Sequence, residues 1–321
     1  SDPPYCFIEN NKTESIPSMD SPEEFHGLPG FFPGVMADDW SETDVDKRHV
    51  EKAVEFIDNH IESKPEDPFF LYLAISAPHN PWLPPEYTEG VSREGPRGDM
   101  GVLVDWCVDQ VYEALSARGI LENTLLIFTS DNGPMKGQNG QKSSGNLRDY
   151  KNTAFEGGHR IPFIARWPGK IEPGTVRDET ISLIDFYATF AELLGHTLDS
   201  SEAEDSYSVL DSLYGNDEFQ PRPVLISDTG GHSSKVGDFA VRVGDWKLIV
   251  LAPVDTDNYA RKKKPPEDAV DGKLLFNLDD DPSETTNLVT KYPDVVDQLA
   301  AGLETVKARG GRFINISRIS I

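Results

Sequence analysis

The stretch Thr124-Leu-Leu-Ile-Phe-Thr-Ser-Asp131-Asn132-Gly133-Pro134 decides the fold that the sequence predicts. It is a short apolar run that suits a strand, and it ends at an acid, an amide and a Gly-Pro pair. In an open parallel sheet, ligands gather beyond the carboxyl ends of the strands. Asp131 and Asn132 would offer a carboxylate oxygen and an amide oxygen there, the donors that Ca²⁺ and Mg²⁺ prefer. The alternative interpretation is that Asp131-Asn132-Gly133 merely turns the chain.

Two amphipathic helices are predicted, each followed by an apolar run that suits a strand. Apolar side chains recur at helical spacing over residues 44–62 and 99–118. The first helix precedes the continuous apolar run Phe69–Ile75, which is typical of a strand buried on both faces. The second precedes the stretch quoted above. This repeated order predicts a doubly wound α/β sheet, to which Phe163–Trp167 adds a strand and residues 180–195 add a third helix.

The rest of the chain predicts a smaller α+β unit with an antiparallel sheet. Residues 199–219 are acidic and rich in serine, as a linker or surface segment would be. A hairpin that turns at Gly244-Asp245 and a last helix over 293–308 are expected after it. The expected strands are Val224–Ser227, Phe239–Val243, Trp246–Leu251 and Leu274–Leu278. We therefore expect two domains, residues 1–198 and 199–321.

Composition narrows the classes of partner. Of the 321 residues, 37% are hydrophobic and 10% are aromatic, which predicts a globular protein. The net charge of −25 argues against nucleic acid, because phosphates require an excess of Lys and Arg. No apolar run is long enough to span a bilayer, and residues 1–5 do not open a signal peptide. Cys107 is expected in the core, and with the distant Cys6 it sets no disulfide framework.

His79 lies in a stiff loop after the predicted strand Phe69–Ile75. Residues 76–85 contain four prolines, and such a loop can hold an imidazole in place as a proton donor or anion partner. A surface histidine with a local hydrogen bond is the alternative. His232, in a loop of the smaller unit, is a second candidate for contact with a substrate.

Positive charge also gathers around Gly157-Gly158 in an otherwise acidic chain. Lys151, His159 and Arg160 supply it. For His159 and Arg160 we favour structural roles, a packed imidazole and an ion pair with Glu156. The polar residues 135–150 before Lys151 are expected to form an active-site loop or a mobile one.

The combination of these segments resembles the type I sulfatases of the alkaline-phosphatase-like superfamily. The order and spacing of the segments carry the resemblance over most of residues 50–307. The first part of the chain contributes Pro68-Phe-Phe-Leu-Tyr…Ala-Pro-His79, Ile127-Phe-Thr-Ser-Asp131-Asn132-Gly133 and Lys151…Glu156-Gly157-Gly158-His159-Arg160-Ile-Pro162. The second part contributes Gly244-Asp-Trp-Lys-Leu-Ile and Leu275-Phe-Asn-Leu-Asp-Asp-Asp-Pro282-Ser-Glu-Thr-Thr-Asn287-Leu.

The resemblance implies a fold, an activity and a set of site residues. The fold is an alkaline-phosphatase-like mixed sheet flanked by helices, with the smaller α+β domain at its C-terminal end. The activity is hydrolysis of aryl or carbohydrate sulfate esters, in proteins that are often periplasmic or extracellular. By that likeness, Asp131 and Asn132 are two ligands of a Ca²⁺ ion, His79 contacts the sulfate or aids the leaving oxygen, and Lys151 binds a sulfate oxygen.

The chain departs from the family at its nucleophile. In the family this is a cysteine oxidised to formylglycine within Cys-x-Pro-x-Arg, or a serine in the same pattern, and neither pattern occurs here. Cys6 and Cys107 stand in other contexts, and Asp38-Asp39 lacks the strand that precedes the family's paired metal ligands. We therefore expect the later portion of a sulfatase, inactive alone. The alternatives are a phosphate or phosphonate ester hydrolase of the same superfamily and a non-catalytic protein that binds sulfated glycans.

Overall fold

The computed structural model describes residues 2–199, 201–217, 219–229, 237–252 and 265–309. Contacts between Cα atoms divide the chain into two compact units, residues 1–123 and 124–321. Each unit is described by itself below. The domain boundary expected between residues 198 and 199 is a different kind of division, and it stays a prediction.

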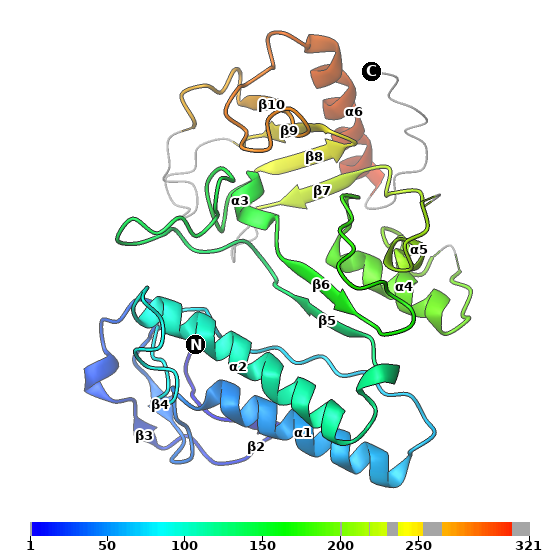
Figure 1. The fold of residues 1–321 in the computed structure, drawn as a ribbon. Coiled ribbons are helices and arrows are strands. Elements are labelled where there is room, and N and C mark those ends of the chain that lie inside the picture. The colour runs from blue at the N-terminus through cyan, green and yellow to red at the C-terminus, as the bar shows by residue number, and fades with distance from the viewer. Residues whose placement is uncertain (1, 200, 218, 230–236, 253–264, 310–321) are drawn as a thin grey trace. The chain divides into compact units, whose positions relative to one another are not determined.

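Two long helices, α1 (Val45–Ser63) and α2 (Pro96–Ala117), form the body of the first unit and pack on one another (Figure 1). Both were predicted within a few residues. Helix α2 begins three residues early because Pro96 suits the first turn, where an N–H has no partner inside the helix. Cys107 is buried in the core as predicted, and burial together with the nearby Asp46 raises the pKa of its thiol to about 12.

The predicted strand Phe69–Ile75 is not a strand in the structure, and this prediction was wrong. Its side chains alternate between partial burial and exposure: Leu71 and Leu73 pack on the helices, whereas Phe70 is 70% and Tyr72 78% exposed. One face is therefore covered rather than two. Among the described residues, no other segment of the chain pairs with residues 69–75. Without hydrogen bonds to a neighbouring strand, an extended segment is not a strand.

Short elements precede the helices of the first unit. Tyr5 is buried and stacks on the buried Phe31 with ring centroids 5.2 Å apart, whereas Phe32 is 56% exposed. The elements are β1 (Ile8–Glu9), β2 (Lys12–Thr13), β3 (Met19–Asp20), the 3-10 helix η1 (Glu23–Phe25) and β4 (Val35–Met36), with η2 (Leu121–Asn123) closing the unit.

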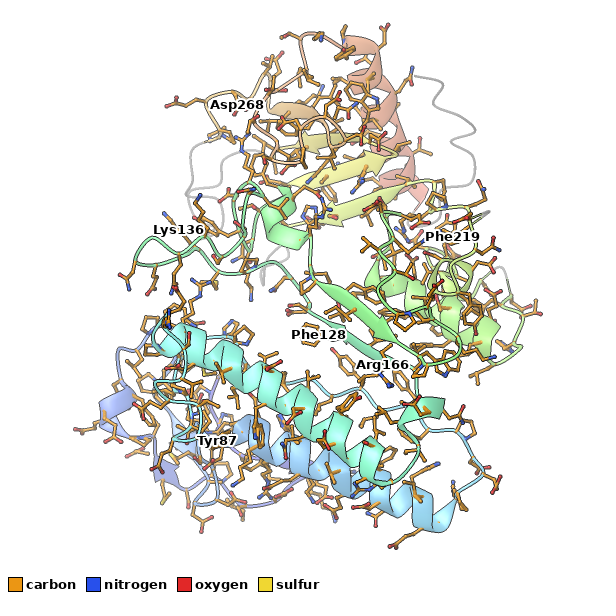
Figure 2. All side chains as sticks on the ribbon, in the orientation of Figure 1. Tyr87, Phe128, Lys136, Arg166, Phe219 and Asp268 are labelled. Carbon is orange, nitrogen blue, oxygen red and sulfur yellow. The ribbon has the colours of Figure 1, made fainter. Side chains whose placement is uncertain are left out.

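The second unit begins with the predicted strand β5 (Leu126–Thr129), which pairs with β6 (Phe163–Arg166). Figure 2 marks the pair by Phe128 on β5 and Arg166 on β6. The pairing is antiparallel, with Phe128 opposite Ile164, so it fits a mixed sheet rather than an all-parallel one. The short helix α3 (Glu156–His159) lies between the two strands in the sequence.

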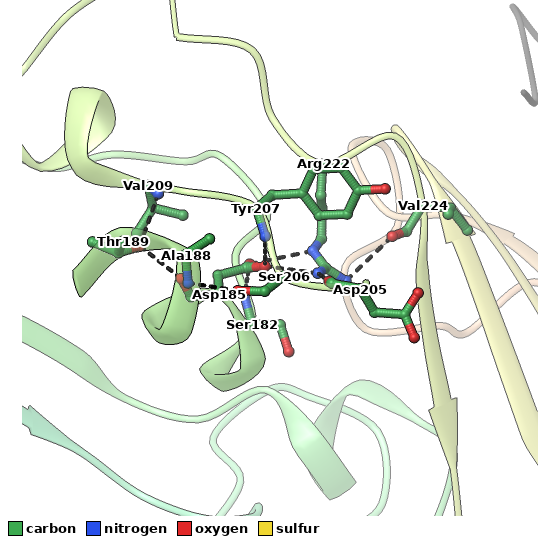
Figure 3. A network of polar contacts seen from close by, with 10 residues as sticks. All are labelled: Ser182, Asp185, Ala188, Thr189, Asp205, Ser206, Tyr207, Val209, Arg222 and Val224. Carbon is green, nitrogen blue, oxygen red and sulfur yellow. Dashed lines mark hydrogen bonds and ion pairs between the residues drawn. The ribbon is translucent and has the colours of Figure 1, made fainter. Parts of the chain in front are cut away.

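The helix expected over residues 180–195 is shorter, with η3 (Leu183–Asp185) leading into α4 (Phe186–Leu193). The segment expected to be a linker or a surface segment is tied to this helix (Figure 3). Arg222 donates to both carboxylate oxygens of buried Asp185, which also accepts the Tyr207 N–H. The buried ion pair thus gains the partners that such a pair needs, and the same segment forms α5 (Leu210–Leu213), which packs on α4.

The C-terminal sheet is antiparallel, as predicted, in the order β10-β9-β8-β7. Its strands are β7 (Leu225–Asp228), β8 (Phe239–Val243), β9 (Trp246–Val250) and β10 (Lys273–Asn277). The hairpin between β8 and β9 turns at Gly244-Asp245, and Gly244 has the positive φ of 55° that glycine tolerates best.

The predicted last helix, α6 (Pro293–Arg309), packs on one face of this sheet (Figure 1). Leu248 of β9 and Leu275 of β10 pack in one core cluster with Leu299 and Leu303 of α6. Their neighbours in the strands belong to a second core cluster with Phe155, just before α3. The alternation follows the two-residue period of a strand, so the sheet lies between α6 and the segment that leads into α3.

Candidate functional site

The turn that carries Asp131 and Asn132 and the segment that carries Lys151 are joined by backbone hydrogen bonds. The Lys151 N–H donates to the carbonyl oxygen of Pro134 at 2.9 Å, and the Gly133 N–H donates to that of Gly158 at 2.9 Å. Residues 135–150 therefore form a loop whose two ends are tied together. As expected, it contains no helix or strand.

Two glycines allow this close approach. A Cβ atom on Gly133 would lie 2.1 Å from the Gly157 carbonyl oxygen, and one on Gly157 would lie 2.3 Å from that of Asp149. Both positions exclude a side chain without movement of the backbone. The Gly157 N–H also donates to the carbonyl oxygen of Arg148 at 2.9 Å. The Gly-Gly pair of α3 thus packs against the turn that carries Asp131 and Asn132.

Asp131 and Asn132 follow β5 as predicted. The Asp131 carboxylate is exposed, and the Asn132 amide nitrogen donates to the Gly133 carbonyl at 3.2 Å, which directs the amide oxygen to another partner. These hard oxygens fit one part of a cation site. Among the described residues no group of three or more His, Cys, Asp or Glu side chains could hold a metal, so this pair supplies a minority of the six to eight ligands that Ca²⁺ takes.

His79 belongs to the first unit, at the end of a turn anchored by the buried Asp46 of α1. One Asp46 oxygen accepts the Ser76 N–H at 2.6 Å, and the other accepts the Ala77 N–H at 2.8 Å. The His79 N–H donates to the Ser76 carbonyl at 2.9 Å. Nδ1 of His79 lies 2.6 Å from the Asn80 carbonyl, which only accepts, so Nδ1 carries the hydrogen and Nε2 is the acceptor nitrogen of the neutral ring.

The structural roles favoured for Arg160 and His159 are confirmed. Nη1 of Arg160 lies 3.9 Å from one oxygen of Glu156, and Nε2 of the partly buried His159 lies 3.6 Å from the other. Burial alone would raise the pKa of Glu156, but His159 and Lys247 hold the pKa of this carboxyl well below its usual range.

Sequence reasoning missed three residues that support the site. They are Asp46, Lys247 and Glu284, and all are buried. A signal existed for Lys247, because it is a charged residue inside the apolar strand Trp246–Val250, where an unpaired charge would be costly. No pattern pointed to Asp46, and Glu284 lies within the quoted segment Leu275–Leu288 without being singled out, because the partners of both are remote in the sequence.

The structure thus brings the turn of Asp131 and Asn132 together with the segment of Lys151 inside the second unit. Convergence of His79 with them stays a prediction. His232 lies outside the described residues. Among the described residues, no helix has the length and apolar character that crossing a bilayer requires.

Two family models match the chain. The model described as sulfatase matches residues 5–196, and the one described as the C-terminal region of aryl-sulfatase matches residues 232–310. An N-acetylgalactosamine-6-O-sulfatase of Bacteroides thetaiotaomicron is 33% identical over 296 residues, which are 88% of this chain and 55% of the relative. Arylsulfatase A of Bos taurus is 37% identical over 252 residues, 75% and 49% of the two chains.

Solved structures of sulfatases are also similar to this chain. One from Bacteroides thetaiotaomicron, described with the metabolism of multiple glycosaminoglycans, has a TM-score of 0.74 and 32% identity over 88% of this chain and 59% of its own. The PsFucS1 sulfatase from Pseudoalteromonas sp. has a TM-score of 0.70 and 27% identity over 83% and 53%. The chain spans about half the length of the curated relatives it matches. It belongs to the sulfatase family, with the alkaline-phosphatase-like fold of that family.

Proposed function

We propose that the protein to which these residues belong hydrolyses sulfate esters of carbohydrates. The observation that carries the proposal is the joining of the Asp131-Asn132 turn to the Lys151 segment through Gly133 and Gly158, in a chain of the sulfatase family. An acidic protein repels anions at long range, so a sulfate site must be built locally from fixed positive charges. Lys151 is the residue that would supply such a charge in this unit.

Each residue has a defined task in this proposal. Lys151 binds a non-bridging sulfuryl oxygen and stabilises the charge that grows there as the S–O bond breaks. His79 presents Nε2, because its Nδ1 hydrogen is engaged by Asn80, and in its protonated form it gives a proton to the leaving oxygen. Asp131 and Asn132 would hold a divalent cation in part, proposed to be Ca²⁺, which supplies further charge stabilisation when bound.

The family implies a formylglycine nucleophile, and this chain contains no Cys-x-Pro-x-Arg sequence. We therefore expect negligible turnover of a chromogenic aryl sulfate by the 321 residues alone with Ca²⁺ present. A periplasmic or extracellular location belongs to the same proposal, as does the absence of a nucleic-acid partner, which the net charge of −25 supports.

A glycan substrate is favoured over a simple aryl ester by the relatives, because the one matched over 88% of this chain is named for a sulfated amino sugar. A phosphate ester hydrolase is the rival within the superfamily, and a sulfated-glycan-binding protein is the rival without catalysis. The three possibilities differ in what they turn over and what they merely bind.

The test uses the polypeptide encoded by the whole reading frame that contains these residues. It is assayed with 4-nitrophenyl sulfate, 4-nitrophenyl phosphate and 6-O-sulfated N-acetylgalactosamine. The proposal expects release of sulfate and little release of phosphate. Preferential phosphate release would favour the rival hydrolase. A reading frame without a Cys/Ser-x-Pro-x-Arg sequence, whose product binds the sulfated sugar without cleaving it, would favour the binding protein.

A further inference from the structure

Lys247 occupies an unusual place for an ammonium group. Strand β9 alternates, so Trp246 and Leu248 face α6, while Lys247 and Ile249 face the segment that leads into α3. Only 1% of Lys247 is exposed. A charge in such surroundings must be matched by partners, because burial without them is strongly unfavourable.

Two buried carboxylates share this ammonium. Nζ of Lys247 lies 2.8 Å from Oε1 of Glu156 on α3 and 2.8 Å from Oε1 of Glu284 in the loop after β10. The contact with Glu156 is a hydrogen bond, whereas that with Glu284 is a charge contact without hydrogen-bond geometry. Glu156 is 3% and Glu284 0% exposed. The cluster therefore joins these three groups from segments remote in the sequence, and Nε2 of His159 also lies 3.4 Å from Nζ of Lys247.

Glu284 adds two links of its own, one to α3 and one to the loop of residues 135–150. Its Oε2 accepts the Glu156 N–H at 2.6 Å, and its carbonyl oxygen accepts a hydrogen bond from Nη1 of Arg148 at 2.7 Å. Its backbone has a φ of 52°, a region that residues other than glycine rarely adopt. Asp281 supports this shape, because its carboxylate accepts the N–H groups of Thr285 and Thr286. A side chain is thus retained at a position where glycine would be less strained.

These links continue from α3 to the candidate site. The Gly157 N–H donates to the Arg148 carbonyl, and the Gly158 carbonyl accepts the Gly133 N–H, next to Asn132. The backbones pack closely at Gly133 and Gly157, where an added Cβ would lie 2.1 Å and 2.3 Å from a carbonyl oxygen. A displacement of α3 would therefore move the turn of Asp131 and Asn132 and the loop that ends at Lys151.

We propose that Glu284 and Lys247 are positioning residues: they fix α3 to the C-terminal sheet, and through α3 they set the places of Asp131, Asn132 and Lys151. The proposal deepens the proposed function and rests on it for the roles of those three residues. The positions that it assigns can be tested without turnover.

The buried pair of Asp185 and Arg222 provides a matched control. Asp185 is 1% exposed, comparable with Glu284, and its carboxylate also accepts backbone N–H groups, those of Ser182 and Tyr207 (Figure 3). Glu284→Gln and Asp185→Asn each replace one buried carboxylate oxygen by an amide nitrogen at nearly constant volume. The two variants therefore differ in which backbone segments they release.

The experiment measures amide hydrogen exchange in the whole 321-residue chain by NMR or mass spectrometry. In Glu284→Gln we expect exchange at Gly133, Lys151 and Gly157 to rise by roughly tenfold or more, with much smaller changes at Ser182 and Tyr207. In Asp185→Asn we expect the reverse. Should Glu284→Gln fail to fold, Glu284→Asp withdraws the carboxylate by one methylene group and is expected to give the same local pattern.

Equal increases at all these amides in both variants, or unchanged exchange at Gly133 and Lys151 in Glu284→Gln, would overturn the proposal. Sulfatase assays of the polypeptide encoded by the whole reading frame decide the proposed function separately. Sulfate release with an unaltered exchange pattern would refute the positioning role alone. The expected exchange pattern without sulfate release would refute the proposed function alone.

Discussion

The carboxylate of Asp46 accepts the backbone N–H of Ser76 at 2.6 Å, thirty residues further along the chain. The same carboxylate accepts the Ser76 hydroxyl at 2.8 Å and the Ala77 N–H at 2.8 Å. Helix α1 thereby holds the turn that leads to His79. A buried acid on a helix thus fixes a loop that its own sequence leaves without regular structure.

Replacement of Asp46 by Asn is expected to lower the free energy of unfolding by about 2–4 kcal/mol, because hydrogen bonds to a buried charged acceptor are lost. Urea denaturation measures the change. Asp58→Asn on the same helix is the control, since Asp58 pairs with Arg118 at the surface, and a far smaller effect is expected there. Equal effects of the two substitutions would contradict the anchoring role of Asp46.

Gly133→Ala is expected to destabilise the second unit by about 1–3 kcal/mol, because the new Cβ would meet the Gly157 carbonyl at 2.1 Å. Gly101→Ala is the matched substitution. Gly101 lies in α2 with no atom within 4 Å of its Cβ position, so alanine should stabilise that helix by about 0.5–1 kcal/mol. Thermal unfolding of both variants gives the signs. Stabilisation by Gly133→Ala would show that the packing on α3 is not tight.

Ionisation of Glu284 is expected to contribute to the pH dependence of the free energy of unfolding. Burial raises the pKa of Glu284 in the folded state, although Lys247 opposes the rise. The folded state therefore binds this proton more tightly, so the stabilisation is present below the ordinary glutamate pKa and is lost as the pH rises through the raised value. Glu156, whose pKa is lowered, has the opposite sign and loses its contribution as the pH falls.

Comparison of the wild type with Glu284→Gln isolates the contribution of Glu284 to the pH dependence of stability. The stability of the wild type relative to the variant is expected to fall as the pH rises above about 4.3, with a slope of up to about 1.4 kcal/mol per pH unit. Urea unfolding between pH 4 and 8 measures it. A difference that is constant with pH, or that grows as the pH rises, is the result that would count against a raised pKa of Glu284.

Calcium binding by the 321-residue chain should be weak. Asp131 and Asn132 offer two side-chain oxygens where Ca²⁺ takes six to eight, so a Kd on the order of 1 mM or weaker is expected. Calorimetry with the wild type and Asp131→Ala tests this. Tight binding that Asp131→Ala abolishes would mean that this chain carries a more complete cation site than the pair provides.

Much of the fold follows from periodicity. Helices α1, α2 and α6 and the strands of the C-terminal sheet carry apolar side chains at the spacing of their own secondary structure, so local pattern sufficed. The error at Phe69–Ile75 has a physical cause. Composition indicates that a segment favours extension, but a strand also needs a neighbour, and pairing is not encoded in the segment itself.

Some residues of the candidate site could likewise be predicted from local sequence patterns, and others could not. Asp131, Asn132, His79 and Lys151 were identified because motifs place them at the ends of elements. Asp46, Lys247 and Glu284 were not identified as supporting residues, because each contacts a partner that lies at least thirty residues away in the sequence. The residues that hold a site are specified by tertiary contacts, whereas those that perform its chemistry recur in short patterns.

The most direct test of the account asks whether His79 and Lys151 serve one sulfuryl group. It measures kcat/KM for 4-nitrophenyl sulfate in the polypeptide encoded by the whole reading frame, in the two single alanine variants and in the double variant. We predict that each single substitution lowers kcat/KM by about 100-fold or more, and that the double variant loses less than the product of the two. Full activity in Lys151→Ala, or strictly multiplicative losses in the double variant, would contradict the claim that both residues act on the same anion.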